Sequence, residues 1–245
     1  ATLTGMATRG GPQRKGGRPG PAKPSAKPKA SAKPRAKAVP EPATVAAPPA
    51  GPFRLGAVPG ATPGKWIDTW KTRMPRTPLE LVPLLVAQQR AAFVRGEVDA
   101  AIVRLPLDRD GLHVIPLYEE TTVVVCAADS HLTAADELTV EDLAGEVRIV
   151  PRDDVLDLDV PGTEAPRFAA PATTGEAIET VAAGVGIVIV PMSLARLHHR
   201  KDVTFRPLAG APASAVALAW PADGTTELVD AFVGIVRGRT ANSSR

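Results

Sequence analysis

The sequence contains few of the residues used for covalent and redox chemistry. Its 245 residues include a single cysteine, Cys126, so neither an internal disulfide nor a Cys-x-x-Cys motif can form. The Gly-x-Ser-x-Gly and His-Glu-x-x-His patterns are also missing, which argues against a nucleophile elbow and a helical zinc site. These absences predict that the protein is not an enzyme and uses no cofactor.

Long apolar runs are missing as well. No stretch reaches the roughly 18 apolar residues that span a bilayer. The N-terminus carries basic residues but no apolar segment of the kind found in secretory signals. We therefore expect no membrane partner and a cytoplasmic location.

Acidic residues are nearly absent from the first 52 positions. This region has a net charge of +9, with Glu41 as its one acid, whereas the rest of the chain has a net charge of −6. Its Pro, Ala, Gly and Lys composition offers little to bury, so we expect residues 1–52 to form a disordered basic tail. The ten cations are Arg9, Arg14, Lys15, Arg18, Lys23, Lys27, Lys29, Lys33, Arg35 and Lys37.

The function of this basic tail remains open between two alternatives. Closely spaced cations on an extended backbone can neutralise phosphates with little sequence preference, and the composition resembles the tails of histone-like proteins. The tail would then bind DNA and associate the protein with the nucleoid. The other alternative is a solvated linker that binds nothing specific.

Strand-like and helix-like patterns alternate from Phe53 onward, which indicates an α/β fold. Between Thr173 and Pro191 the pattern changes from helix to strand. Thr173 and Glu176 have capping-box spacing, and Gly184 ends the helix. The β-branched run 187–190 is typical of a buried parallel strand. Further strands are expected at 53–58, 79–82, 98–103, 112–117, 122–128, 203–208 and 214–220, with a strand-forming segment at 147–150, and further helices after Thr62 and at 87–95 and 227–236.

Several sequence blocks, in this order, resemble the effector-binding domain of LysR-type transcriptional regulators. They are Gly-Glu-Val-Asp-Ala-Ala-Ile-Val at 96–103, Pro-Leu at 116–117, Ser-His-Leu at 130–132 and Val-Ala-Ala-Gly-Val-Gly-Ile at 181–187. The resemblance implies a two-lobed fold like a type 2 periplasmic binding protein over residues 53–245. Lobe one would comprise residues 53–127 and 218–240, and lobe two residues 128–217.

The resemblance also implies a function. LysR-type effector domains sense small metabolites in transcription regulation, and they pair side by side as antiparallel dimers. We expect helix 87–95, with Phe93, to contribute to such a homodimer. The family's winged helix-turn-helix has no counterpart in this sequence, where the basic tail stands in its place. A solute-binding protein and an enzyme of the prephenate dehydratase type remain alternatives, although the latter's Thr-Arg-Phe motif reads Pro-Arg-Phe at 166–168.

We expect the effector to be a small anion bound between the lobes. Helix N-termini present unpaired N–H groups, and an arginine fork suits a carboxylate. In the family, the first loop, the end of the strand at Arg104 and the Thr173-Thr174 position contact effectors. Alternatively, the threonines only cap helices and the arginines only lie at the surface. The predicted ligand-binding residues are Pro59, Thr62, Lys65, Arg104, Arg152, Thr173 and Thr174.

The one acidic cluster does not predict a metal site. A calcium loop starting at Asp157 would place Pro161 at a ligand position and Phe168 where the closing glutamate is required. We interpret the cluster as a solvated acidic loop. Cys126, within a run of valines, is interpreted as a small core residue.

Overall fold

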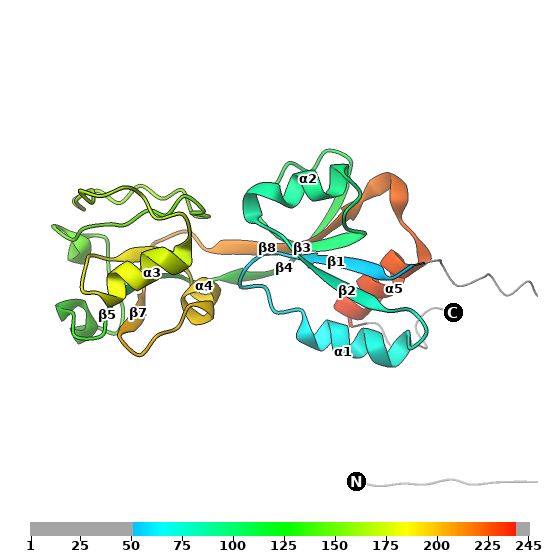
Figure 1. Cartoon of the computed structure of the whole chain (residues 1–245), viewed down its shortest axis with the longest axis horizontal. Helices are drawn as coiled ribbons and strands as arrows, with labels where there is room; N and C mark the ends of the chain where they lie inside the picture. The colour runs from blue at the N-terminus through cyan, green and yellow to red at the C-terminus, as the bar shows by residue number, and fades with distance from the viewer. Residues whose placement is uncertain (1–50, 239–245) are drawn as a thin grey trace, which may run out of the picture. The chain divides into compact units, whose positions relative to one another are not determined.

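The computed structural model describes residues 51–238, which all belong to one compact unit of the chain, residues 47–245. Two separate sheets divide these residues into two lobes (Figure 1). Residues 1–50 of the tail, with its ten cations, lie outside the described residues, so the predicted disorder and DNA binding of the tail stay predictions. Within residues 51–238, no helix is both long enough and apolar enough to cross a membrane.

Lobe one contains a five-stranded sheet in the order β2-β1-β3-β8-β4. β1 runs parallel to β2 and β3, while β8 runs antiparallel to β3 and β4. Helices α1 and α5 cover one face and α2 covers the other (Figure 1). The bounds are β1 Phe53–Ala57, α1 Gly64–Arg73, β2 Leu79–Pro83, α2 Gln89–Val94, β3 Ala100–Arg104, β4 Leu112–Glu120, β8 Ser214–Pro221 and α5 Glu227–Val236, with 3-10 turns η1 Val86–Gln88 and η4 Ala222–Gly224.

Lobe two contains a three-stranded antiparallel sheet in the order β6-β5-β7. Helices α3 and α4 pack on one face, and loops and short turns between 128 and 173 supply most of the core on the other. The bounds are β5 Thr122–Ala127, α3 Thr174–Ala182, β6 Val188–Pro191, α4 Met192–Leu197 and β7 Val203–Pro207, with 3-10 turns η2 His131–Ala134 and η3 Glu141–Leu143.

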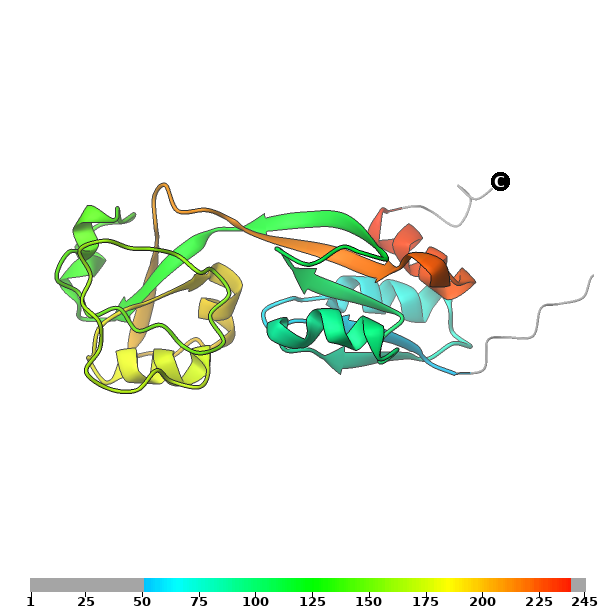
Figure 2. The same ribbon diagram turned by 90° about the horizontal axis from the view of Figure 1, so that it is seen from above.

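The chain crosses between the lobes twice. The first crossing is at Thr121, between β4 and β5, and the second lies between β7 and β8. Figure 2 shows the two segments running together from one lobe to the other. The polypeptide therefore links the lobes through a narrow two-stranded hinge.

Three expectations about the fold require correction. β5 was placed in lobe one, but it pairs with β6 and β7, so the crossings lie near 121 and 213 instead of 127 and 218. β6 is buried as predicted, yet its partner β5 is antiparallel. Residues 147–150 form only isolated bridges, from Val147 to Glu164 and from Arg148 to Ile187, because no neighbouring strand extends the pairing.

Candidate functional site

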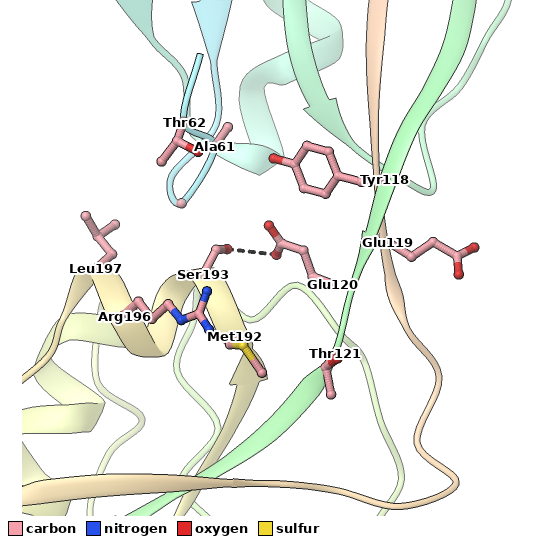
Figure 3. Close-up of a pocket in the computed structure, with 11 residues that line it drawn as sticks. Ala61, Thr62, Tyr118, Glu119, Glu120, Thr121, Met192, Ser193, Arg196 and Leu197 are labelled. Carbon is pink, nitrogen blue, oxygen red and sulfur yellow. Dashed lines mark hydrogen bonds between the residues drawn. The ribbon is translucent and has the colours of Figure 1, made fainter. Parts of the chain in front are cut away.

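A cavity of about 540 Å³ lies between the lobes. Three segments line it: the loop that follows β1, the end of β4 and helix α4 (Figure 3). Its volume falls in the range of roughly 300–1,000 Å³ that is usual for small-molecule sites. The lining residues are Gly60, Ala61, Thr62, Tyr118, Glu119, Glu120, Thr121, Met192, Ser193, Arg196 and Leu197.

Gly60 brings the first loop close to lobe two. Its φ is +83°, and a Cβ at this position would overlap the side chain of Ser193 on α4. Glycine therefore serves two purposes here, because it accepts the left-handed backbone and leaves room for the other lobe. The contact brings the loop of lobe one and the first turn of α4 together at the cavity wall.

A buried ion pair lies beside the cavity. Arg104, at the end of β3, donates from Nη1 to Glu120 Oε2 at 2.9 Å, and the two side chains are 1% and 9% exposed. The Gln89 side chain of α2 fixes the Arg104 backbone with two hydrogen bonds. Because each charge is desolvated, each depends on the other for compensation.

Two serines extend this ion pair, one from each lobe. Arg104 Nη1 also donates to Ser214 Oγ at 2.6 Å, at the start of β8. Ser193 Oγ, from lobe two, donates to Glu120 Oε2 at 2.7 Å, as the dashed line in Figure 3 shows. Arg104 Nη2 approaches the same Ser193 hydroxyl at 3.4 Å. Glu120 and Arg104 of lobe one thus form a polar contact with Ser193 of lobe two.

Tyr118 and Arg196 supply the other polar groups of the cavity. Burial, together with the negative charge of Glu120, raises the pKa of the Tyr118 hydroxyl above its ordinary value of 10.0. The hydroxyl therefore stays protonated at neutral pH and can donate a hydrogen bond. The Arg196 side chain is exposed and forms no hydrogen bond or ion pair with any of the residues that the structure describes.

The comparisons identify the family of this two-lobed architecture. The LysR substrate binding domain matches residues 46–241. The chain belongs to this family. Among curated relatives, the Hca operon transcriptional activator HcaR of Escherichia coli K12 is 28% identical over 202 residues, or 77% of this chain and 68% of HcaR. The regulator AlsR of Bacillus subtilis is 25% identical over 69% of this chain and 59% of its own length.

Solved structures of LysR-type regulators have the same fold. The reduced OxyR regulatory domain of Pseudomonas aeruginosa has a TM-score of 0.61 at 24% identity, covering 76% of this chain and 97% of that domain. The BenM effector binding domain, solved with its effector benzoate, has a TM-score of 0.64 at 19% identity, covering 77% of this chain and 91% of that one. These likenesses confirm the type 2 periplasmic-binding-protein-like fold predicted from the sequence.

Arg104, a predicted ligand-binding residue, lies beside the cavity of this LysR effector domain and forms a buried ion pair there. Its guanidinium is already neutralised by Glu120 and is 1% exposed. An effector carboxylate would therefore have to compete with a buried ion pair. This pairing could not be predicted from local sequence, because Glu120 lies 16 residues away along the chain and reaches Arg104 only in the folded sheet; a ligand contact of Arg104 stays a prediction.

The first loop contributes one of its three predicted residues to the cavity. Thr62 lines it, whereas Pro59 and Lys65 do not. Thr62 was also predicted to cap the following helix. Helix α1 instead begins at Gly64 with Pro63 as its N-cap, and no side chain caps it. The predicted helix start was one residue too early, because Pro63 is the N-cap residue and not the first residue of the helix.

The remaining predicted ligand residues do not line the cavity. Thr173 caps α3 by accepting from Glu176 N at 3.2 Å, while the Glu176 carboxylate accepts from Ala172 N, one residue earlier than in a standard capping box. Thr174 is buried and donates to Asp153 at 2.9 Å. Arg152 is exposed on the loop that precedes α3. Their geometry matches the alternative of caps and surface groups.

Sequence reasoning missed the residues that make this cavity polar. Glu120, Ser193 and Arg196 belong to no motif, and Tyr118 is the only tyrosine of the chain. A weak signal existed, because Tyr118 and Glu120 lie at the end of one strand and Ser193 lies two residues after the end of another. Residues at strand ends commonly face ligands in α/β proteins.

No metal site is found within residues 51–238, where no three His, Cys, Asp or Glu side chains cluster suitably. Cys126 is buried in the core of lobe two, as the sequence indicated. A second cavity of about 540 Å³ lies wholly within lobe two, lined by Arg148, Val150, Phe168 and the loop 159–166.

Proposed function

We propose that residues 51–238 sense a small-molecule effector in the cavity between the lobes and contribute to transcription regulation. The observation that carries this proposal is the position of the cavity, since its walls come from both lobes and a two-stranded hinge connects them. A molecule that contacts both walls stabilises one angle between the lobes over others, and this is how binding becomes a conformational signal.

The relatives support the regulatory part of the proposal. HcaR is an operon activator and AlsR is a transcriptional regulator. The effector of BenM is benzoate, an organic acid of a size that suits a cavity of about 540 Å³. Arg196 offers an unpaired cation for such an acid, and α1 begins at the cavity edge without a side-chain cap. A small organic acid is accordingly the proposed effector class.

A thermal-shift screen tests the proposal. Small organic acids, amines, sugars and nucleosides would be tested against the wild-type chain and against Thr62→Trp, whose indole should fill the cavity from an exposed position. Thr72→Trp, at an exposed position in helix α1 and not among the residues that line the cavity, is the control. We expect a hit that raises the melting temperature of wild type and control but not of Thr62→Trp. Equal shifts in all three proteins would place the ligand outside the cavity.

The proposal includes a homodimer and a non-enzymatic role. Phe93, the residue predicted to lie in the dimer interface, is only 7% exposed and packs in the core. Another residue of helix α2 must therefore make the contact with the partner. Val94, on the same helix, is 73% exposed and is the better candidate. Light scattering at micromolar concentrations should give a dimer mass that Val94→Glu reduces. A monomeric wild type would refute the dimer.

DNA binding by the basic tail is a separate part of the proposal. Its support is the +9 charge of residues 1–52 beside a remainder of −6. Affinity for duplex DNA should fall steeply with salt concentration, because each neutralised phosphate releases counterions. A chain that starts at Phe53 should lose this affinity. Equal DNA binding by both chains would refute the role of the tail.

A further inference from the structure

One oxygen of the buried Glu120 carboxylate lacks a hydrogen-bond donor. Oε2 accepts from both Arg104 and Ser193, whereas no donor to Oε1 is found among the residues of the described region. The side chain is 9% exposed, and Figure 3 shows its second oxygen pointing toward the space between Thr62 and Tyr118. Because Glu120 lines the cavity, a donor group on a ligand can take the place of water at this free oxygen and form a hydrogen bond to a charged acceptor.

The charge balance at Glu120 excludes a carboxylate from this end of the cavity. Arg104 directs Nη1 and Nη2 at Glu120 and two serines, so its charge is compensated within the protein. A ligand carboxylate placed against Glu120 Oε1 would meet a like charge, and the nearest bonded cation, Arg104, is already engaged by Glu120. A hydrogen-bond donor meets no such penalty.

The free cation of the cavity lies on α4, where Figure 3 shows Arg196 in the wall opposite the strand that carries Tyr118. Its guanidinium has no hydrogen-bond or ion-pair partner among the described residues. Its planar fork suits a carboxylate. Apolar surface is supplied by Ala61, Met192 and Leu197. The cavity therefore contains both a free hydrogen-bond acceptor, Glu120 Oε1, and a free cation, the Arg196 guanidinium.

We propose that the effector is a small carboxylic acid that also carries an amino or hydroxyl group. The amino or hydroxyl group donates to Glu120 Oε1, and the carboxylate pairs with Arg196. This inference rests on the proposed function, since it names the chemistry of a ligand in the same cavity. Arg104 is a positioning residue here, because it orients Glu120 and does not touch the ligand.

Matched sets of acids test the donor requirement. Each set keeps one carbon skeleton and changes one group: leucine, 2-hydroxy-4-methylpentanoate and 4-methylpentanoate; phenylalanine, phenyllactate and 3-phenylpropionate; glutamate, 2-hydroxyglutarate and glutarate. Affinities are measured by calorimetry with the full chain. In at least one set, the amino or hydroxy acid should bind about 10- to 100-fold more tightly than the unsubstituted acid, as expected for one hydrogen bond to a charged acceptor.

Two variants locate the contacts. The double variant Arg104→Met with Glu120→Leu removes the acceptor without leaving a buried charge unpaired, so folding should be retained. It should bind the substituted and unsubstituted acids of a set equally. Arg196→Gln should weaken every acid of the set at least tenfold, whereas Arg200→Gln, an exposed control paired with Glu179, should not.

The outcomes separate this inference from the function on which it depends. If the unsubstituted acid binds as tightly as its amino and hydroxy forms, and Thr62→Trp abolishes that binding, the donor inference is overturned while the effector cavity stands. If binding of every acid survives Thr62→Trp, the cavity itself is wrong. If no set binds at all, the amino or hydroxy acid class is overturned, and the broader screen decides the cavity independently. A donor preference that persists in the double variant also overturns the role of Glu120.

Discussion

The two lobes build their cores from different side chains. In lobe one, the ring of Phe53 stacks on Trp70 at 4.6 Å between centroids and lies 5.2 Å from Phe232. The sheet core of lobe two is aliphatic and includes Val123, Val188 and Ile178. Aromatic rings add a preferred geometry to their buried area, whereas aliphatic side chains adapt more easily. The stability of lobe one should therefore be more sensitive to the replacement of a single core side chain.

The lobes also differ in how their backbones are organised. Five paired strands with helices on both faces form lobe one. In lobe two, the segment 144–173 has no strand or helix and is held by isolated bridges and loop hydrogen bonds, such as Gly145 N to Gly162 O at 2.8 Å. The stability of lobe two should therefore be more sensitive to changes in the backbone conformation of individual turns.

Removing the central ring of lobe one should have the largest effect. Trp70 is fully buried, and its indole N–H donates to Thr77 O at 2.9 Å. Trp70→Ala should lower the free energy of unfolding by about 3–5 kcal/mol, which combines lost burial with an unfilled cavity. Urea unfolding followed by circular dichroism measures this loss. Trp66→Ala, at a partly exposed position of the same helix, is the control, and an equal loss in both variants would contradict the aromatic core as the cause.

A backbone change in lobe two tests the other half of the comparison. Gly186 has a φ of +62°, and a Cβ there would overlap the carbonyl oxygen of Val147, which accepts from Ile187 N at 2.9 Å. Gly186→Ala should cost about 2–3 kcal/mol, since it adds a clash to an unfavourable backbone conformation. Gly184→Ala has a similar φ of +81° without a nearby atom. It should cost only about 1 kcal/mol; equal losses in the two variants would show that backbone conformation alone matters.

The same contrast explains what could be predicted from the sequence. Local patterns located β1, α5 and the capped start of α3 because their signals lie within a few residues. The path of segment 144–173 has no periodic pattern and follows from contacts with distant residues such as Ile187. The polar residues of the cavity were harder still to predict. Arg104 and Ser193 are 89 positions apart in the sequence, and their contact depends on how the two lobes approach each other. The resemblance to LysR-type domains predicted that a cleft would exist but not which side chains would be paired.

Helix capping should affect the two lobes equally. Thr173 caps α3 in lobe two, and Thr226 caps α5 in lobe one by accepting from Val229 N at 3.3 Å. Thr173→Val and Thr226→Val should each cost about 1 kcal/mol of stability, measured by urea unfolding. Because Thr173 does not line the cavity, Thr173→Val should keep the full thermal shift from any ligand found. A reduced shift would restore Thr173 as a ligand contact.

The smallest expected effect concerns alkaline pH in lobe two. Burial raises the pKa of the Cys126 thiol above its ordinary value of 9.0, with smaller opposing contributions from Arg206 and Ser130. The unfolded thiol therefore ionises at a lower pH than the folded one, and its contribution to stability is lost as the pH rises above about 9. One proton limits the slope to about 1.4 kcal/mol per pH unit. Between pH 8 and pH 10 (~2 units), wild type should lose more stability than Cys126→Ala in urea unfolding. Equal losses in the two proteins would mean that another group causes the loss of stability at alkaline pH. Tyr118, whose pKa is also raised, would then be replaced by phenylalanine.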